Sequence, residues 1–230
     1  MASKFDAYAA DYDAALNRGL SLSGESKGYF AAERVRWVAR CLANLGARPA
    51  RVLDFGCGTG GTSPELVHQL GADRVVGVDP SHESLDEARR THTDPRLEFR
   101  QIEELRSSGP FDLAYCNGVF HHIDPGERLT VLAAIRRSLT GTGHFAFWEN
   151  NPWNPATRLV MSRIPFDRDA KLISPPRARD LLVQAGFRVV RTDFLFLFPR
   201  LLAALRPLEL KLTRLPAGAQ YLVLCQKREC

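Results

Sequence analysis

The sequence has no long uninterrupted apolar run, and its few cysteines show no C-x-x-C spacing. A membrane-spanning helix needs about 20 predominantly apolar residues, so none is expected. Residues 1–17 carry four charged side chains instead of a basic stretch followed by an apolar one, so we also expect no signal peptide. The five cysteines fit neither a disulfide framework nor a zinc site, which predicts reduced thiols, a cytoplasmic location and no bound metal.

The composition itself is that of an ordinary globular protein, with 45% hydrophobic and 25% charged residues in a chain of 230. This length suits one α/β domain with a sizeable core. The net charge of +5 is spread unevenly, because residues 158–214 hold twelve Lys or Arg against five Asp or Glu. Solvated helix faces explain such a surplus most simply, but it could also attract an anionic ligand or membrane surface.

Short apolar segments alternate with amphipathic ones from residue 51 onward. This alternation predicts a parallel sheet with helices on both faces. We expect strands at residues 51–55, 74–78, 97–101, 111–116, 144–148, 187–198 and 220–226, and helices at 5–15, 29–45, 63–69, 81–90 and 126–139.

The segment from Asn150 to Ser174 interrupts this rhythm. It contains three prolines and is expected to be irregular. Ser174 can then cap a helix that begins with Pro175 and Pro176 and ends before Gly186.

The most informative stretch is the turn after the first expected strand. Asp54 lies near the end of that strand, and glycines follow at positions 56, 58 and 60. Glycines allow a tight turn that a ligand can approach closely. The next strand ends in Asp79, so a second carboxylate lies beside the turn, where acids accept hydrogen bonds from ribose hydroxyls.

Two kinds of nucleotide site are compatible with this turn. Gly56, Gly58 and Gly61 also satisfy G-x-G-x-x-G, which on its own would suggest a nicotinamide-dependent oxidoreductase. Dinucleotide-binding turns receive a pyrophosphate, however, whereas Asp54 favours a cationic or amine-bearing ligand. The chain also has no room for a separate substrate domain, so we favour the second interpretation.

The combined pattern resembles the class I S-adenosylmethionine-dependent methyltransferases, specifically the type 11/12 group that acts on small molecules. D-x-G-x-G-x-G corresponds to the first motif of this family, and residues 112–123, ending in His121-His122-Ile123, resemble its fourth-strand signature. The resemblance implies a Rossmann-like α/β fold with a seven-stranded sheet, mostly parallel with an antiparallel last strand. It divides the chain into a helical lid at 1–48 and a methyltransferase domain at 49–230, with insertions near 150–173 and 199–217.

S-adenosyl-L-methionine is the cofactor that the resemblance implies. Members of this family commonly have Gly-Asp or Ala-Asp after the third strand, and its acid contacts the adenine. This chain has Gln101-Ile102-Glu103-Glu104 there, so Ile102 or Glu103 is assigned to the adenine. The full predicted set of cofactor-binding residues is Tyr12, Asp54, Gly56, Cys57, Gly58, Gly60, Asp79, Pro80, Ile102, Glu103, Asn117 and Gly118.

Methyl transfer depends mainly on positioning of the acceptor, and a general base helps only if the acceptor must lose a proton. His121 follows the fourth strand at the sheet edge where ligands bind, and it is our candidate base. A structural role between strand and helix explains it about as well. His122, Glu149 and Asn150 are the candidates for holding the acceptor, and a capping role is the alternative for Glu149 and Asn150.

The expected acceptor is a small molecule, apolar or anionic, that receives the methyl group on oxygen, nitrogen or carbon. A nucleic-acid methyltransferase is less favoured, because Asn117-Gly118-Val119-Phe120 lacks the prolines of [ND]-P-P-[FYW]. Leu201, Leu202, Leu205 and Leu208, flanked by Arg200 and Arg206, either roof the pocket or make a peripheral membrane contact. Both a monomer and a homodimer fit the sequence.

Overall fold

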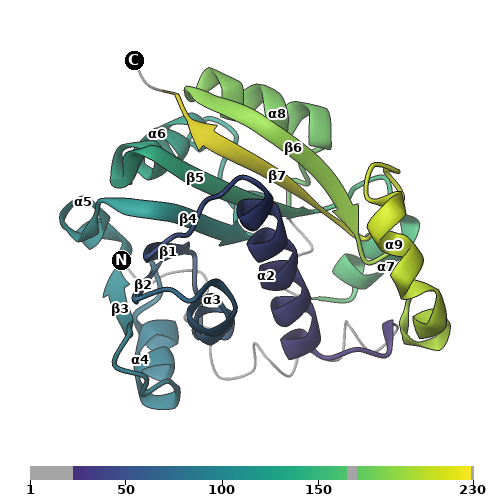
Figure 1. The fold of residues 1–230 in the computed structure, drawn as a ribbon, viewed down its shortest axis with the longest axis horizontal. Helices are drawn as coiled ribbons and strands as arrows, with labels where there is room; N and C mark the ends of the chain where they lie inside the picture. The colour runs from purple at the N-terminus through teal and green to yellow at the C-terminus, as the bar shows by residue number, and fades with distance from the viewer. Residues whose placement is uncertain (1–22, 165–169, 229–230) are drawn as a thin grey trace.

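A computed structural model describes residues 23–164 and 170–228 and contains one sheet of seven strands (Figure 1). The spatial order of the strands is β3-β2-β1-β4-β5-β7-β6. The last strand runs antiparallel to both of its neighbours, and the other pairs are parallel. The predicted seven-stranded sheet is therefore confirmed. Its strands are β1 (Arg51–Phe55), β2 (Arg74–Asp79), β3 (Leu97–Gln101), β4 (Phe111–Asn117), β5 (Leu139–Asn150), β6 (Phe187–Leu195) and β7 (Gln220–Lys227).

Helices cover both faces of this sheet. Side chains of the helices and of the strands pack together in two buried clusters. Helices α2 and α3 contribute to one cluster, and α6 and α8 contribute to the other. In β1, Val52 belongs to the first cluster and Leu53 to the second, as the period-two alternation of strand side chains requires. The α-helices are α2 (Lys27–Asn44), α3 (Ser63–Leu70), α4 (His82–Thr91), α5 (Leu105–Ser108), α6 (Arg128–Ser138), α7 (Pro155–Ser162), α8 (Pro175–Gln184) and α9 (Arg206–Leu212), and the 3-10 helices are η3 (Ile102–Glu104) and η5 (Arg200–Leu205).

The segment between β5 and α8 differs from the irregular loop that we predicted, because it contains the helix α7. Asn154 caps this helix by accepting a hydrogen bond from the backbone N–H of Thr157. Pro155 occupies the first turn, where a missing N–H costs nothing. The proline that suggested a break in structure is thus a helix-start signal.

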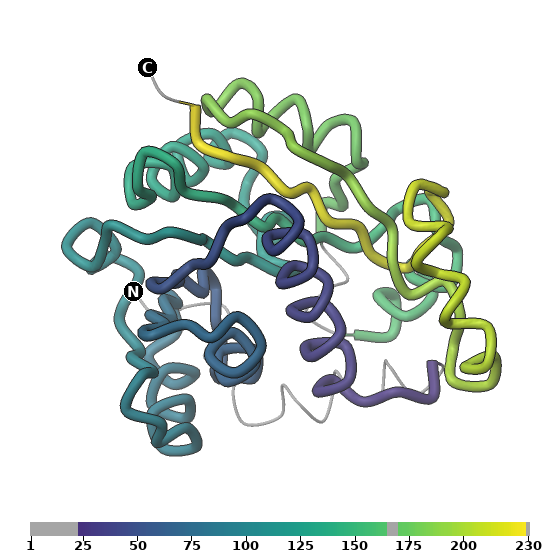
Figure 2. The backbone as a smooth tube through the Cα atoms, in the orientation of Figure 1, coloured from purple at the N-terminus to yellow at the C-terminus, as the bar shows by residue number. Residues whose placement is uncertain are grey.

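Of the predicted helical lid at residues 1–48, the structure describes residues 23–48. The expected helix at residues 5–15, with Tyr12, lies outside the described residues. The following helix, α2, packs Val35, Val38 and Leu42 into the core beside α3. Residues 23–26, which lead into α2, run beside α9, far from them in sequence (Figure 2). Arg206 and Glu25 form an ion pair of 2.8 Å between these two segments.

Candidate functional site

The turn between β1 and α3 has the tight geometry that its glycines predicted. Gly56, Gly58 and Gly60 have φ values of +72°, +52° and +76°, in the left-handed region that side chains disfavour. The backbone N–H groups of Gly56 and Cys57 both donate to the carbonyl of Val78 in β2. A Cβ added at Gly58 would meet nothing within 4 Å, so the turn leaves open space above it.

Substitution of Gly56 is expected to destabilise the fold strongly. An added Cβ would lie 2.4 Å from Cγ2 of Val119, in addition to the backbone strain. We expect Gly56→Ala to cost about 1–2 kcal/mol for the left-handed backbone and a further 1–3 kcal/mol for overpacking. Gly46→Ala is the matched control, because Gly46 has φ +69° and nothing near its Cβ position. Urea unfolding would test this, and equal losses for both variants would contradict the predicted clash.

Two carboxylates flank the turn, as the sequence predicted. Asp54 is buried and accepts a hydrogen bond of 2.7 Å from Oγ of Ser63. Burial raises its pKa to about 6, although the Ser63 hydrogen bond acts in the opposite direction. Asp79 ends β2 and accepts hydrogen bonds from the backbone N–H groups of Gly58 and Ser81, both of 2.9 Å. Asp79 therefore ties the glycine turn to the tip of the second strand.

Two adjoining cavities, each of about 360 Å³, open at this edge of the sheet. The one beside β2, here the β2 cavity, has Asp79 and an apolar wall that includes Ile102 and Val131. The other, here the β5 cavity, lies beyond β4 and contains Asp54, His121 and Asn150. The residues that line both are Gly56, Gly58, Thr59, Asn117, Gly118 and His122.

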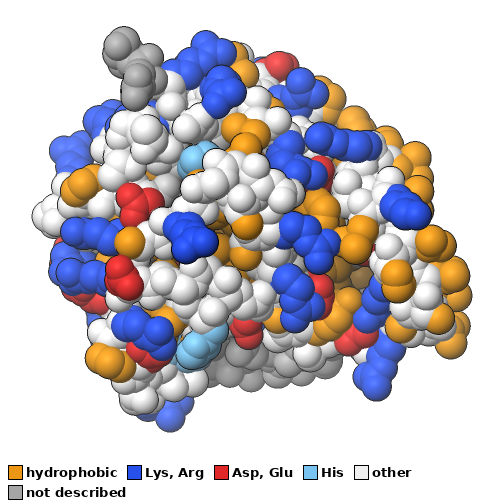
Figure 3. Space-filling model, viewed as in Figure 1, with side chains coloured by type: hydrophobic (Ala, Val, Ile, Leu, Met, Phe, Trp, Pro, Cys, Tyr) orange, Lys and Arg blue, Asp and Glu red, His pale blue; other side chains and the backbone are white. Residues whose placement is uncertain are grey.

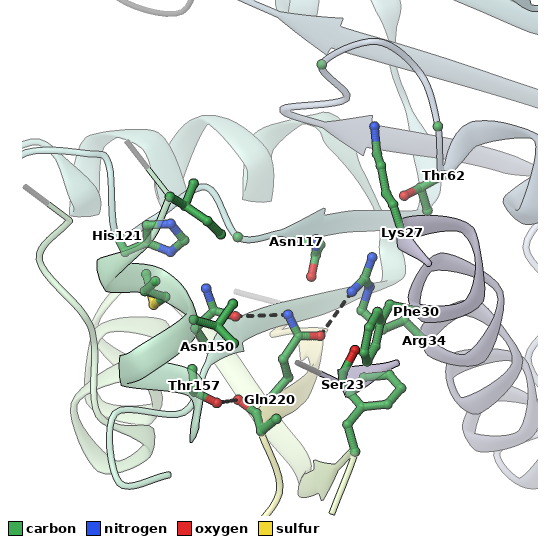
Figure 4. Close-up of a pocket in the computed structure, with 18 of the residues that line it drawn as sticks. Ser23, Lys27, Phe30, Arg34, Thr62, Asn117, His121, Asn150, Thr157 and Gln220 are labelled. Carbon is green, nitrogen blue, oxygen red and sulfur yellow. Dashed lines mark hydrogen bonds between the residues drawn. The ribbon is translucent and has the colours of Figure 1, made fainter. Parts of the chain in front are cut away.

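Asn117 lies where the two cavities meet and has an unusual feature. Its Oδ1 atom is buried and has no hydrogen-bond partner among the residues that the structure describes. A buried polar atom left unsatisfied costs about 1–3 kcal/mol, so such an atom on a cavity wall indicates a ligand partner. Asn117 projects into the open space of Figure 4.

A polar network, of which the sequence analysis found only Asn150, forms one wall of the β5 cavity (Figure 4). Arg34 is 6% exposed and donates through Nε to the hydroxyl of Tyr115 and through Nη1 to Oε1 of Gln220. Nε2 of Gln220 donates in turn to Oδ1 of Asn150. A guanidinium held in this way can bind a carboxylate. The sequence signal for Arg34 was its helical spacing from Lys27 and Phe30, which places all three residues on one face of α2.

His121 also lines the β5 cavity, and Glu149 holds it from behind. The His121 Nδ1 and Glu149 Oε2 atoms are 2.6 Å apart, and both side chains are buried. The other carboxylate oxygen accepts from the backbone N–H groups of Phe120 and His121. Glu149, which we predicted to hold the acceptor, is absent from both cavity linings and contacts His121.

The remaining predicted residues divide into those at the cavities and those elsewhere. Pro80 and Ile102 line the β2 cavity, Cys57 and Asn150 line the β5 cavity, and His122 lines both. Glu103 is exposed and belongs to neither lining. Gly60 serves packing, because a Cβ there would lie 2.8 Å from both His92 and Phe99. Tyr12 lies outside the described residues.

Six larger apolar side chains form another wall of the β5 cavity. Three come from α7 and the residues that follow it, and three from the connection between β6 and η5. Trp153 and Leu159 are exposed on the same segment as α7. These apolar wall residues are Val160, Met161, Ile164, Phe196, Leu197 and Pro199.

Comparisons with known proteins agree with this geometry. Residues 52–143, from β1 into β5, match the family model "Methyltransferase domain". The chain is 34% identical over 167 residues to a trans-aconitate 2-methyltransferase of Methylobacterium nodulans, covering 72% of this chain and 61% of that protein. It is 32% identical over 147 residues to the protein of the same name from Azoarcus sp., covering 62% and 56%. The chain thus spans less than two thirds of the length of these two relatives.

Solved structures show the same fold. Human N-acetylserotonin methyltransferase, solved in complex with S-adenosylmethionine, superposes with a TM-score of 0.66 at 16% identity, covering 98% of this chain and 59% of that one. At this identity the likeness concerns the fold alone. The glycine turn and its two acids lie at the start of the matched methyltransferase domain. The matched part of this chain is a methyltransferase domain, and the fold around it is that of the class I S-adenosylmethionine-dependent methyltransferases.

Proposed function

We propose that this chain transfers a methyl group from S-adenosylmethionine to an oxygen or nitrogen atom of a small acceptor with an apolar body. The observation that carries the proposal is the pair of cavities that meet at Asn117. One cavity has the acid and apolar wall suited to an adenosine, and the other is lined both by polar side chains, such as His121, and by the apolar wall residues. Their junction is where a donor and an acceptor would meet.

The residues of this edge fit the cofactor. Asp79 can accept from ribose hydroxyls, and the apolar wall with Ile102 can cover an adenine. Asp54 and Arg34 offer an anion and a cation to the amino and carboxylate ends of a methionyl group. Between these two ends, the open space above Gly58 leaves room for the cofactor. The unpartnered Oδ1 atom of Asn117 offers it a hydrogen-bond acceptor. When bound, the cofactor supplies an electrophilic methyl group on a sulfonium.

His121 is our proposed proton acceptor. Contact between its Nδ1 atom and Glu149 leaves Nε2 as the nitrogen that can take a proton from a hydroxyl or amine in the β5 cavity. Because Glu149 is fully buried and holds two backbone N–H groups as well, the imidazole is fixed before the acceptor arrives. The apolar wall with Met161 and Phe196 excludes water and positions the acceptor body.

A carboxylate acceptor is the second candidate. The relatives named above are trans-aconitate methyltransferases, and trans-aconitate is an acid. Lys27 and Arg34 both line the β5 cavity, which gives two cationic groups where the cofactor's single carboxylate needs one. A carboxylate is already ionised at neutral pH, so this reaction would need no proton acceptor.

Cofactor binding and methyl transfer test the proposal separately. Isothermal titration is expected to show binding of S-adenosylhomocysteine and none of NADH. Methyl-labelled S-adenosylmethionine would then be incubated with a panel of apolar phenols and amines, and with trans-aconitate. Label in a phenol or amine supports the first candidate, and label in trans-aconitate alone supports the second. Binding of NADH without S-adenosylhomocysteine would overturn both.

The raised pKa of Asp54 predicts a pH-dependent affinity for the cofactor. Burial holds this pKa at about 6, so the carboxylate is ionised above that pH and neutral below it. A cationic amine is attracted only to the ionised form. The affinity for S-adenosylhomocysteine should therefore fall as the pH drops through about 6, by up to about tenfold per pH unit. Titrations between pH 7.5 and 5 would measure it, and Asp54→Asn should flatten the dependence. An equally steep fall in that variant would assign the proton to another group.

A further inference from the structure

The exposed apolar side chains of this protein are concentrated on η5 and α9. Of the twelve large hydrophobic residues that are exposed in the described part of the chain, seven are leucines between positions 201 and 215. Leu201 is 94% exposed, which is far more than any other of the twelve. Scattered exposed leucines are normal, but seven exposed leucines on one short segment of the chain indicate an interaction surface. The leucine surface consists of Leu201, Leu202, Leu205, Leu208, Leu210, Leu212 and Leu215.

Basic side chains accompany this leucine surface. Arg200, Lys211 and Arg214 are exposed on the same segment. The only acid within residues 200–215 is Glu209, which is half-buried and accepts a hydrogen bond of 2.7 Å from the backbone N–H of Phe198. The exposed charges of this surface therefore all have one sign. Figure 3 shows orange apolar atoms along the right edge, where Figure 1 has α9, with blue basic side chains next to them.

The leucine surface also continues into the β5 cavity. Leu197 and Pro199 line that cavity, and η5 begins at the next residue, Arg200. The short connection therefore contacts the cavity on one side and leads directly to the exposed leucines on the other. None of the helices within residues 23–164 and 170–228 has both the length and the apolarity needed to cross a membrane. A surface of this kind can only lie on a bilayer, not span it.

We propose that η5 and α9 dock this protein on an anionic lipid bilayer, with leucines such as Leu201 inserted among the acyl chains and Arg200, Lys211 and Arg214 at the headgroups. Leucine insertion and cation attraction together give the reversible binding typical of interfacial helices. A second copy of the chain fits this surface less well, because a two-fold pairing would bring these like charges together. Docking would place the mouth of the β5 cavity at the lipid surface, within reach of amphiphilic molecules.

Vesicle flotation tests this proposal. The chain of 230 residues would be mixed with vesicles of phosphatidylcholine alone, or of phosphatidylcholine with phosphatidylglycerol. We expect flotation with the phosphatidylglycerol vesicles, and its loss at high salt. Burial of one leucine contributes about 1.5–3 kcal/mol, so Leu201→Glu should lower the membrane partition coefficient at least about tenfold. Lys211→Glu should also lower it, and mainly at low salt.

Matched controls lie elsewhere on the surface. Leu45→Glu changes a leucine that is 47% exposed at the end of α2, and Arg106→Glu changes an exposed cation of α5. Both variants should float like the wild type. The proposal is overturned if the wild-type protein stays at the bottom of the gradient, or if Leu201→Glu floats as well as Leu45→Glu. It is also overturned if Leu201→Glu only converts a dimer into a monomer in analytical ultracentrifugation. Flotation needs neither cofactor nor acceptor, so its outcome is independent of the proposed methyl transfer.

Discussion

Asp79→Ala is expected to weaken the binding of S-adenosylhomocysteine by about 100-fold or more. A hydrogen bond to a charged group contributes about 1.5–3 kcal/mol, and alanine removes the carboxylate that we assign to both ribose hydroxyls. The variant also loses the hydrogen bonds from Gly58 and Ser81, so the glycine turn loses its tie to β2. Isothermal titration measures the affinity, and the variant's thermal unfolding midpoint shows how much of the loss comes from the turn.

Two further variants separate these contributions. Asp79→Asn keeps one acceptor oxygen and most of the shape, so its affinity should lie between those of the wild type and Asp79→Ala. Asp73→Ala removes an exposed acid just before the opposite end of β2 and should bind the ligand as the wild type does. An unchanged affinity in Asp79→Ala would contradict the assignment of the ribose to the β2 cavity.

The sequence predicted the sheet well because the pattern that indicates each strand is local. Strands buried on both faces give short apolar runs, and β1 has the predicted bounds of residues 51–55. The main error among the strands concerns β5, which begins at Leu139 instead of His144. Residues 140–143 read Thr-Gly-Thr-Gly, a turn-like pattern, yet they are assigned to the strand. There the sheet environment overrides the local preference.

Some residues of the site could likewise be found from local sequence patterns, whereas others are brought together only by the fold. Asp54, Asp79 and the glycine turn lie within 26 residues of chain and could be found from spacing alone. The wall formed by Arg34, Tyr115 and Gln220 joins residues 81 and 186 positions apart, and no local pattern pairs them. Glu149 was correctly located at the sheet edge, but which side of β5 it faces depends on packing that only the fold determines.

The proposed role of His121 as proton acceptor also depends on which way its side chain faces. His121→Ala tests this role. We expect this variant to lower kcat by about 10²- to 10⁴-fold, the usual contribution of a general base, if the acceptor is a hydroxyl or amine. Its affinity for S-adenosylhomocysteine should stay near the wild-type value, because we assign His121 to the acceptor and to no group of the cofactor. Single-turnover methyl transfer and isothermal titration measure the two quantities. Unchanged kcat would instead favour a carboxylate acceptor, which has no proton to lose.

Glu149→Gln examines how His121 is held. Glutamine can still accept from the N–H of Phe120, but its amide N–H₂ would face Nδ1 of His121 and favour the tautomer with the proton on Nε2. That nitrogen could then no longer accept a proton from the acceptor. We expect kcat to fall almost as far as in His121→Ala, with little change in KM. Raising the pH should not restore it, because the defect is the position of a proton on a neutral ring and not its charge. A purely structural role for Glu149 would instead lower the unfolding midpoint and leave kcat per folded molecule intact.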